Sequence, residues 1–94
     1  MSNFSLSGKI ALLTGAAGFF GRYFAHALAD AGAFVVLVDR NAKRLEAMRQ
    51  ERPTQFMVFP VDLYDRSAAR GILEGITQRY ALDILINNAF DFSI

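Results

Sequence analysis

Short, solid runs of apolar residues alternate along this chain with segments of helical periodicity. Residues 10–14, 34–38 and 56–61 are mostly β-branched, aliphatic or aromatic, and 84–86 form a fourth run near the end of the sequence. Runs of this kind, without alternating polar residues, are typical of strands covered on both faces. The pattern therefore predicts four strands, the second of which ends at Asp39.

The segment 19–31, between the first two strands, carries apolar residues at helical spacing. The residues predicted to face inward are Phe20, Phe24, Ala27, Leu28 and Ala31. They recur at the intervals of three and four residues that define one face of a helix. His26 falls elsewhere on the helix, which predicts a surface position. Gly32 is expected to end the helix, since glycine readily adopts the conformation that follows a helical terminus.

Two further helices are predicted before the fourth strand. Asn41 is a candidate N-cap for a polar helix over residues 42–51. This helix is expected to turn Leu45 and Met48 inward. Asp65 can cap the next helix in the same way. The predicted apolar face of that helix consists of Ala69, Ile72, Leu73, Ile76 and Tyr80.

The resulting order is β-α-β-α-β-α-β with short connections. Solid apolar strands separated by amphipathic helices predict an α/β fold, with a parallel sheet covered on both faces. Right-handed crossovers then give a doubly wound sheet with strand order 3-2-1-4. A sheet of this class normally continues beyond its fourth strand, so we expect it to be incomplete at the C-terminal end of this sequence.

Composition narrows the functional classes. Ten Lys and Arg residues face nine Asp and Glu residues, so there is no excess of basic charge to attract nucleic acid or an acidic membrane surface. The chain has no cysteine and one histidine, which argues against a metal site and suits a reducing, cytoplasmic location. The apolar run that begins at residue 10 resembles a signal sequence. Interrupting glycines and the following Arg22 favour a buried strand instead.

A glycine-rich turn follows the first predicted strand, where residues 14–21 read T-G-A-A-G-F-F-G. Gly15 permits a tight turn, Gly18 a close approach by a ligand, and Gly21 close packing of helix on strand. A pyrophosphate needs backbone N–H groups at the positive end of a helix, with no side chain in the way. The strand–turn–helix setting therefore predicts a dinucleotide-binding loop, with a purely structural turn as the alternative.

Asp39 lies at the end of the second strand, 18 residues after Gly21. A carboxylate in this place can accept hydrogen bonds from the adenosine ribose and repels a 2′-phosphate, which favours NAD over NADP. The neighbouring Arg40 could accommodate a 2′-phosphate or stack on adenine, so NADP stays an alternative. A simple acidic residue at a strand end is the structural alternative for Asp39.

Together these residues resemble the short-chain dehydrogenase/reductase family, over essentially all 94 residues. The resemblance rests on the glycine turn, Asp39, Asp62-Leu63 after the third strand, and the Asn-Asn-Ala segment 87–89. It implies that Asp62 contacts the adenine amino group, that Leu63 flanks the ring, and that Asn-Asn-Ala lines the ribose and steadies the sheet. Without the resemblance, Asp62 and the two asparagines are also ordinary turn residues.

Two positions depart from the family pattern. The usual turn is T-G-x-x-x-G-x-G, whereas here Phe19 replaces the middle glycine and Gly18 supplies it instead. This spacing resembles the extended branch of the family, which includes sugar-nucleotide epimerases and dehydratases. The Asn-Asn-Ala segment resembles the classical branch, although Phe90 replaces the glycine that usually follows. Giving the second segment more weight, we predict a classical-like member.

The resemblance implies that residues 1–94 form the N-terminal part of a single NAD(P)-binding Rossmann domain. The implied activity is hydride transfer between a nicotinamide and a carbonyl or alcohol substrate. The family's catalytic Tyr-x-x-x-Lys does not occur in the sequence. We expect the catalytic Ser, Tyr and Lys beyond residue 94, and this segment alone to be inactive. The alternatives are an extended-type sugar-nucleotide enzyme and a non-catalytic dinucleotide-binding module.

The sequence thus assigns a cofactor site, and it assigns no catalytic residue or metal ligand. We expect a small-molecule substrate and no nucleic-acid or membrane partner. An apolar fraction of 53% is more than so short a chain can readily bury alone, which indicates a larger parent fold or a partner, and we expect a homo-oligomer. The candidate cofactor-binding residues are Gly15, Ala17, Gly18, Phe19, Phe20, Gly21, Asp39, Arg40, Asp62, Leu63, Asn87, Asn88 and Ala89.

Overall fold

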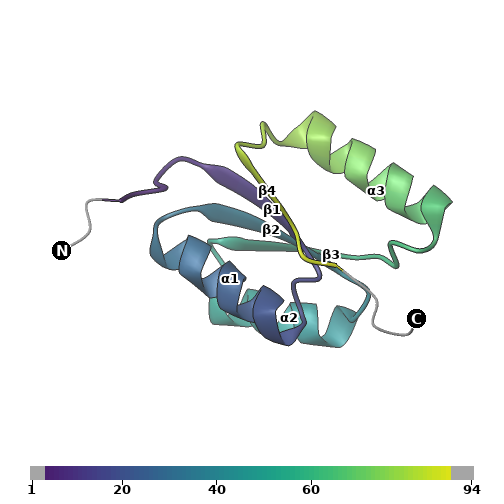
Figure 1. Ribbon diagram of the computed structural model, residues 1–94, viewed down its shortest axis with the longest axis horizontal. Coiled ribbons are helices and arrows are strands. Elements are labelled where there is room, and N and C mark those ends of the chain that lie inside the picture. The colour runs from purple at the N-terminus through teal and green to yellow at the C-terminus, as the bar shows by residue number, and fades with distance from the viewer. Residues whose placement is uncertain (1–3, 90–94) are drawn as a thin grey trace.

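The computed structural model describes residues 4–89, which form a four-stranded parallel sheet with helices on both faces (Figure 1). The strands are β1 (Ile10–Thr14), β2 (Phe34–Asp39), β3 (Phe56–Pro60) and β4 (Ile84–Asn87). The helices are α1 (Phe19–Asp30), α2 (Ala42–Glu51) and α3 (Arg66–Arg79). The sheet order is β3-β2-β1-β4 with parallel pairing throughout, which confirms the predicted doubly wound α/β fold.

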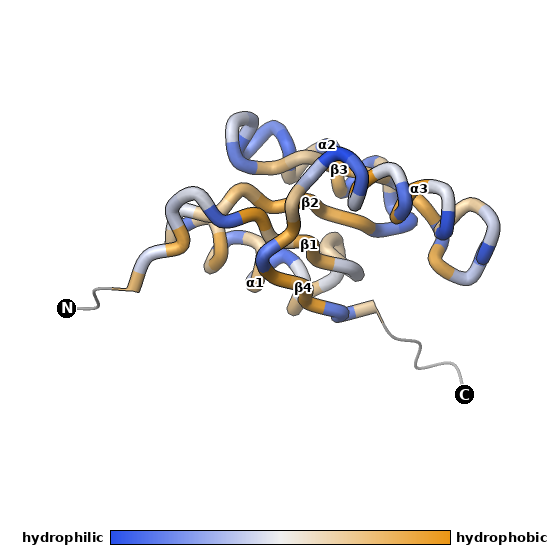
Figure 2. Tube along the Cα trace, turned by 90° about the horizontal axis from the view of Figure 1, so that it is seen from above, coloured by the Kyte–Doolittle hydropathy of each residue, from blue (hydrophilic) through white to orange (hydrophobic). Residues whose placement is uncertain are grey.

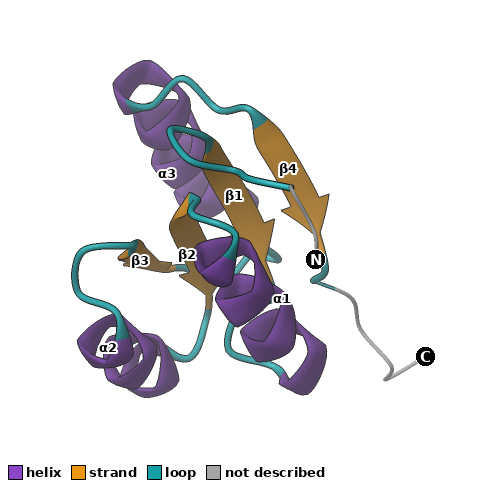
Figure 3. Ribbon diagram, turned by 90° about the vertical axis from the view of Figure 1, so that its left-hand side faces the viewer, coloured by secondary structure: helices purple, strands orange, loops and turns teal. Residues whose placement is uncertain are grey.

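Two apolar layers lie on opposite faces of the sheet. Helices α1 and α2 cover one face and α3 covers the other (Figure 3). Successive strand residues alternate between the two layers, and the strands carry the most hydrophobic part of the chain (Figure 2). The first layer includes Leu13, Val35, Leu37, Leu45 and Phe56. The second includes Leu12, Val36, Val38, Ala69 and Ile76.

The predicted helix caps are confirmed. The Asn41 side chain accepts a hydrogen bond from the backbone N–H of Arg44 at 3.0 Å, at the start of α2. Asp65 does the same for Ala68 at 3.2 Å, at the start of α3. Gly32 follows α1 with a φ of +105°, a conformation that favours glycine. Polar side chains thus mark where α2 and α3 begin, and a glycine marks where α1 ends.

The predicted inward face of α1 is wrong in part. The buried residues of α1 are Gly21, Ala25 and Ala29, whereas Phe20 is exposed and Phe24 is half-buried. These three small residues recur every four positions and let the helix backbone approach the sheet closely. Of the predicted inward residues, Phe24 and Leu28 are half-buried and pack against the apolar layer on this face, which confirms that part of the prediction, whereas Phe20 is exposed. Ala27 is also exposed.

His26 is not a simple surface residue, contrary to the expectation. Its Nδ1 accepts a hydrogen bond from Arg52 Nε at 2.9 Å, and its ring packs edge-on against Phe56. Arg52 also bonds to Asp30, and so links α1 to the loop that precedes β3. The histidine is thus part of a polar junction between elements that are distant in sequence. No periodicity within α1 could have indicated this role.

Substitutions on the outer side of helix α3 test whether that side is exposed to solvent in the full-length protein. A Cβ added at Gly71 or Gly75 would meet no atom within 4 Å, and both residues have ordinary helical conformations. Replacing either glycine by alanine should raise the free energy of unfolding by about 0.5–1 kcal/mol, because glycine is a poor helix former. Urea unfolding of the full-length protein measures this. A loss of stability would mean that another part of the protein packs against these positions.

Candidate functional site

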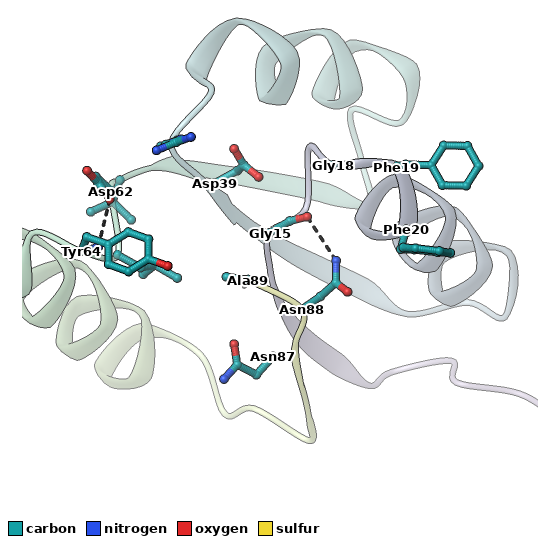
Figure 4. A pocket seen from close by; sticks show the side chains of 13 residues that line it. Gly15, Gly18, Phe19, Phe20, Asp39, Asp62, Tyr64, Asn87, Asn88 and Ala89 are labelled. Carbon is teal, nitrogen blue, oxygen red and sulfur yellow. Dashed lines mark hydrogen bonds between the residues drawn. The ribbon is translucent and has the colours of Figure 1, made fainter. Parts of the chain in front are cut away.

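An open cleft of about 850 Å³ lies at the edge of the sheet where the strands end in their carboxyl direction (Figure 4). Its volume falls in the range of small-molecule sites, roughly 300–1,000 Å³. In doubly wound sheets, ligands bind at this edge, where the strand order reverses. The reversal lies here between β1 and β4. The cleft is therefore the candidate functional site.

Gly15, in the loop after β1, and Gly21, in the first turn of α1, lie very close to the surrounding backbone. Gly15 has a φ of +65°, and a Cβ there would lie 2.9 Å from the carbonyl oxygen of Asn88. A Cβ on Gly21 would lie only 2.0 Å from the carbonyl oxygen of Gly15. Neither position has room for a side chain unless the backbone moves. These two glycines shape the turn and seat α1 on it.

Gly18 differs from the other two glycines because the space around it is open. It is the N-cap of α1, with an extended backbone and no side chain that could cap the helix. A Cβ there would meet only the Gly15 carbonyl oxygen, at an ordinary contact distance of 3.5 Å. The first N–H groups of a helix have no partner within the helix and carry its partial positive charge. The loop thus presents backbone donors to the cleft.

The Thr14 hydroxyl fastens the glycine turn to the end of β4. This side chain is 6% exposed, and register places it beside Asn87. Its hydroxyl donates to Asn87 Oδ1 at 2.8 Å and accepts from the backbone N–H groups of Asn88 and Ala89, at 3.0 and 3.2 Å. Asn88 Nδ2 also reaches the Gly15 carbonyl oxygen, at 3.4 Å. The sequence analysis assigned Thr14 no role, although a polar residue at the end of an apolar strand was the available signal.

Asp39 braces the glycine turn from the side of β2. Its Oδ2 accepts a hydrogen bond from the backbone N–H of Ala17 at 3.1 Å, and its Oδ1 accepts one from Asn41 at 2.9 Å. The carboxylate therefore links the turn to the loop that begins α2, and it also lines the cleft. Arg40 lines the cleft beside it. The guanidinium of Arg40 has no hydrogen-bond or ion-pair partner among residues 4–89.

The loop after β3 forms the far wall of the cleft. Asp62 Oδ1 accepts a hydrogen bond from the backbone N–H of Tyr64 at 2.9 Å, and the Asp62 carbonyl accepts one from Asp65 at 3.0 Å. Leu63 and Tyr64 both line the cleft, as does the buried Val61. The sequence analysis missed Val61 and Tyr64. Their place next to Asp62-Leu63 was the signal that could have included them.

The structure brings the predicted site residues together, with two differences in position. Ala17 and Gly21 do not line the cleft: Ala17 is buried and gives its N–H to Asp39, and Gly21 packs under the turn. Phe90, which departs from the family pattern, lies outside the described residues. The predicted residues that line the cleft are Gly15, Gly18, Phe19, Phe20, Asp39, Arg40, Asp62, Leu63, Asn87, Asn88 and Ala89.

Two kinds of feature are absent from residues 4–89. In this part of the chain, no cluster of three or more histidine or acidic side chains could hold a metal ion. No helix in the same range is long and apolar enough to cross a membrane.

Comparison with known proteins assigns the family. The family model of short chain dehydrogenases matches residues 9–90. The chain belongs to the short chain dehydrogenase family. A family member from Colletotrichum higginsianum, the short chain dehydrogenase/reductase dpchG, is 39% identical over 88 residues, which cover 89% of this chain and 33% of that protein. This chain spans 26% of the short-chain dehydrogenase fogG of Aspergillus ruber and 51% of the short chain dehydrogenase/reductase dpmpG of Macrophomina phaseolina, so it corresponds to only part of the length of these relatives.

Solved structures of the family carry the same arrangement of strands and helices. The Pseudomonas aeruginosa RhlG complex with NADP has a TM-score of 0.82 and 34% sequence identity, and the match covers 94% of this chain and 37% of that one. The 3-ketoacyl-(acyl-carrier-protein) reductase of Brucella melitensis, complexed with NADH, has a TM-score of 0.77 and 33% identity. That match covers 86% of this chain and 34% of that one.

Substitutions at Gly21 and Gly18 should differ in how much they destabilise the protein. Gly21→Ala should lower the free energy of unfolding by about 3 kcal/mol or more, because its Cβ would collide with backbone that cannot move independently. Gly18→Ala should cost at most about 1 kcal/mol, the difference between glycine and alanine at an N-cap. Chemical denaturation of the full-length variants measures both values. Equal losses at the two positions would show that the turn is not seated as described.

Proposed function

We propose that the complete protein is an NAD(P)-dependent oxidoreductase that transfers hydride between a nicotinamide and a carbonyl or alcohol substrate. The observation that carries this proposal is the open position at Gly18, where the start of α1 faces the cleft. Family membership supports it, and so do the solved relatives in complex with NADP and NADH. Residues 1–94 are then the N-terminal part of a single nucleotide-binding domain.

The residues at the turn fit a dinucleotide pyrophosphate. This group needs backbone donors, positive potential and the absence of a side chain, and the start of α1 supplies all three. In this proposal the backbone at Gly18, Phe19 and Phe20, which line the cleft, binds the pyrophosphate, whereas the N–H of Ala17 is already donated to Asp39. Gly15 and Gly21 act indirectly, because their missing side chains let the turn take its shape.

Asp39 fits the adenosine ribose. A carboxylate has about four acceptor positions, and two of these are used by Ala17 and Asn41. The remaining capacity can accept the ribose hydroxyls, while the negative charge repels a 2′-phosphate, so we propose NAD as the preferred cofactor. Arg40 has no ionic partner in the described part of the chain. Its guanidinium is free to pair with the 2′-phosphate of NADP, which makes NADP the secondary cofactor in this proposal.

The remaining wall residues complete the site. We propose that Asp62 and Leu63 contact the adenine and that Asn87, Asn88 and Ala89 line the ribose on the nicotinamide side. The bound nicotinamide supplies the hydride chemistry. The residues of this chain bind and orient the cofactor, and we place the proton-transferring Ser, Tyr and Lys of the family outside residues 1–94.

Location and assembly belong to the same proposal. We propose a cytoplasmic protein, supported by a sequence without cysteine. We also propose a homo-oligomer, supported by an apolar fraction of 53%, which is higher than in an average globular protein.

The proposal predicts that Gly18→Val loses cofactor binding while the protein stays folded. The branched side chain would occupy the space that the pyrophosphate needs, so affinity for NAD⁺ should fall by well over tenfold. Calorimetric titration of the full-length protein measures the affinity, and circular dichroism checks the fold. Unchanged affinity would contradict the assignment of the turn. A wild-type protein that binds NAD⁺ but oxidises no NADH with any of a panel of carbonyl compounds would be a binding module instead.

Asp39→Ser should shift cofactor preference towards NADP. The substitution removes a ribose acceptor and a charge that repels the 2′-phosphate. Because the variant also loses braces of the turn, activity with both cofactors should fall. The ratio of kcat/KM for NAD to that for NADP isolates the effect of the charge. If this ratio does not change, Asp39 acts only as a structural residue.

A further inference from the structure

Tyr64 places a large, exposed aromatic side chain at the wall of the cleft. It lines the cleft and is 69% exposed. Its ring has no aromatic or cationic partner within residues 4–89, and its hydroxyl has no hydrogen bond there. Figure 4 shows the ring reaching from the loop after β3 towards the middle of the cleft, on the side opposite Gly18 and Phe19. Exposed aromatic rings of this kind mark binding surfaces.

The backbone that carries Tyr64 is fixed at both ends. The N–H of Tyr64 donates to Asp62 Oδ1 at 2.9 Å, and the next residue, Asp65, donates its own N–H to the Asp62 carbonyl at 3.0 Å. The Asp65 side chain then caps α3 through Ala68. A ring on a turn with three such bonds loses little backbone freedom when a ligand binds. The side chain is therefore preorganised to serve as a contact surface.

The position of Tyr64 identifies the part of the ligand that it would meet. It lies in the loop after β3, next to Asp62 and on the side of the cleft opposite the turn that faces a pyrophosphate. In a dinucleotide whose pyrophosphate lies at Gly18, the group that reaches this end is the adenine. An aromatic ring recognises a flat base by stacking, with no need for a specific hydrogen bond.

We propose that Tyr64 stacks on the adenine ring and sets the affinity of the adenosine half of the cofactor. This inference rests on the function proposed above, and it adds a contact outside the Asp62-Leu63 pair. The interaction uses the face of the ring, so phenylalanine should replace tyrosine without loss. It acts on binding of the adenosine moiety and leaves the nicotinamide end unaffected.

Calorimetric titration of the full-length protein with AMP, nicotinamide mononucleotide and NAD⁺ tests the proposal. Tyr64→Ala should weaken binding of AMP and NAD⁺ by roughly tenfold, the size expected for the loss of one base–aromatic stack. Its affinity for nicotinamide mononucleotide should stay unchanged, and Tyr64→Phe should bind all three ligands as the wild type does. In NMR spectra, the adenine H2 and H8 signals of AMP should shift upfield with the wild type and not with Tyr64→Ala.

Tyr23→Ala is the matched control, because Tyr23 is 70% exposed and lies on α1 outside the residues that line the cleft. It should bind each ligand with wild-type affinity. Equal AMP affinity in Tyr64→Ala and wild type would overturn the inference, as would a loss confined to nicotinamide mononucleotide. Either result leaves the proposed function standing if the wild type binds NAD⁺. A wild type that binds neither NAD⁺ nor NADP⁺ would overturn the proposed function as well.

Discussion

The approach of α1 to the end of β1 is the constraint on which the site depends. Gly21 lies directly over the Gly15 carbonyl, so closely that a single added carbon would collide with it. This contact seats the helix and directs its start into the cleft. Ala25 and Ala29 continue the same small-residue face along the sheet. If α1 stood farther from the sheet, its N-terminal N–H groups would point away from the strand ends.

Around that contact, three strand ends are joined by polar groups and not by apolar packing. Thr14 connects β1 to the end of β4, and Asp39 connects β2 to the turn. Asp62 folds the loop after β3 on itself. Hydrogen bonds are directional, so they fix the relative positions of these loops. The cleft is therefore held in shape before any ligand binds.

Local signals made most of the fold predictable from the sequence. Strand positions followed from apolar runs, and helix starts followed from Asn41 and Asp65, whose partners are three residues away. The inner face of α1 was mispredicted in part, because close packing placed small residues at its centre and left Phe24 and Leu28 at its margin. The setting of His26 depends on Arg52, 26 residues later, and no local pattern contains it. For the site, glycine spacing indicated the turn, but not that Thr14 and Asp39 brace it. The branch suggested by that spacing remains a prediction.

The Asp39 carboxylate combines a structural role with its proposed role in cofactor selection, and this limits which substitutions the protein tolerates at that position. In our proposal the group that discriminates between cofactors is also the acceptor for the Ala17 N–H and the Asn41 N–H. A natural or engineered variant that replaces Asp39 must supply new acceptors for the N–H groups of both Ala17 and Asn41. A change of cofactor preference that keeps full activity is therefore expected to need several coordinated substitutions. A single replacement at position 39 would first give a protein whose glycine turn is less well braced.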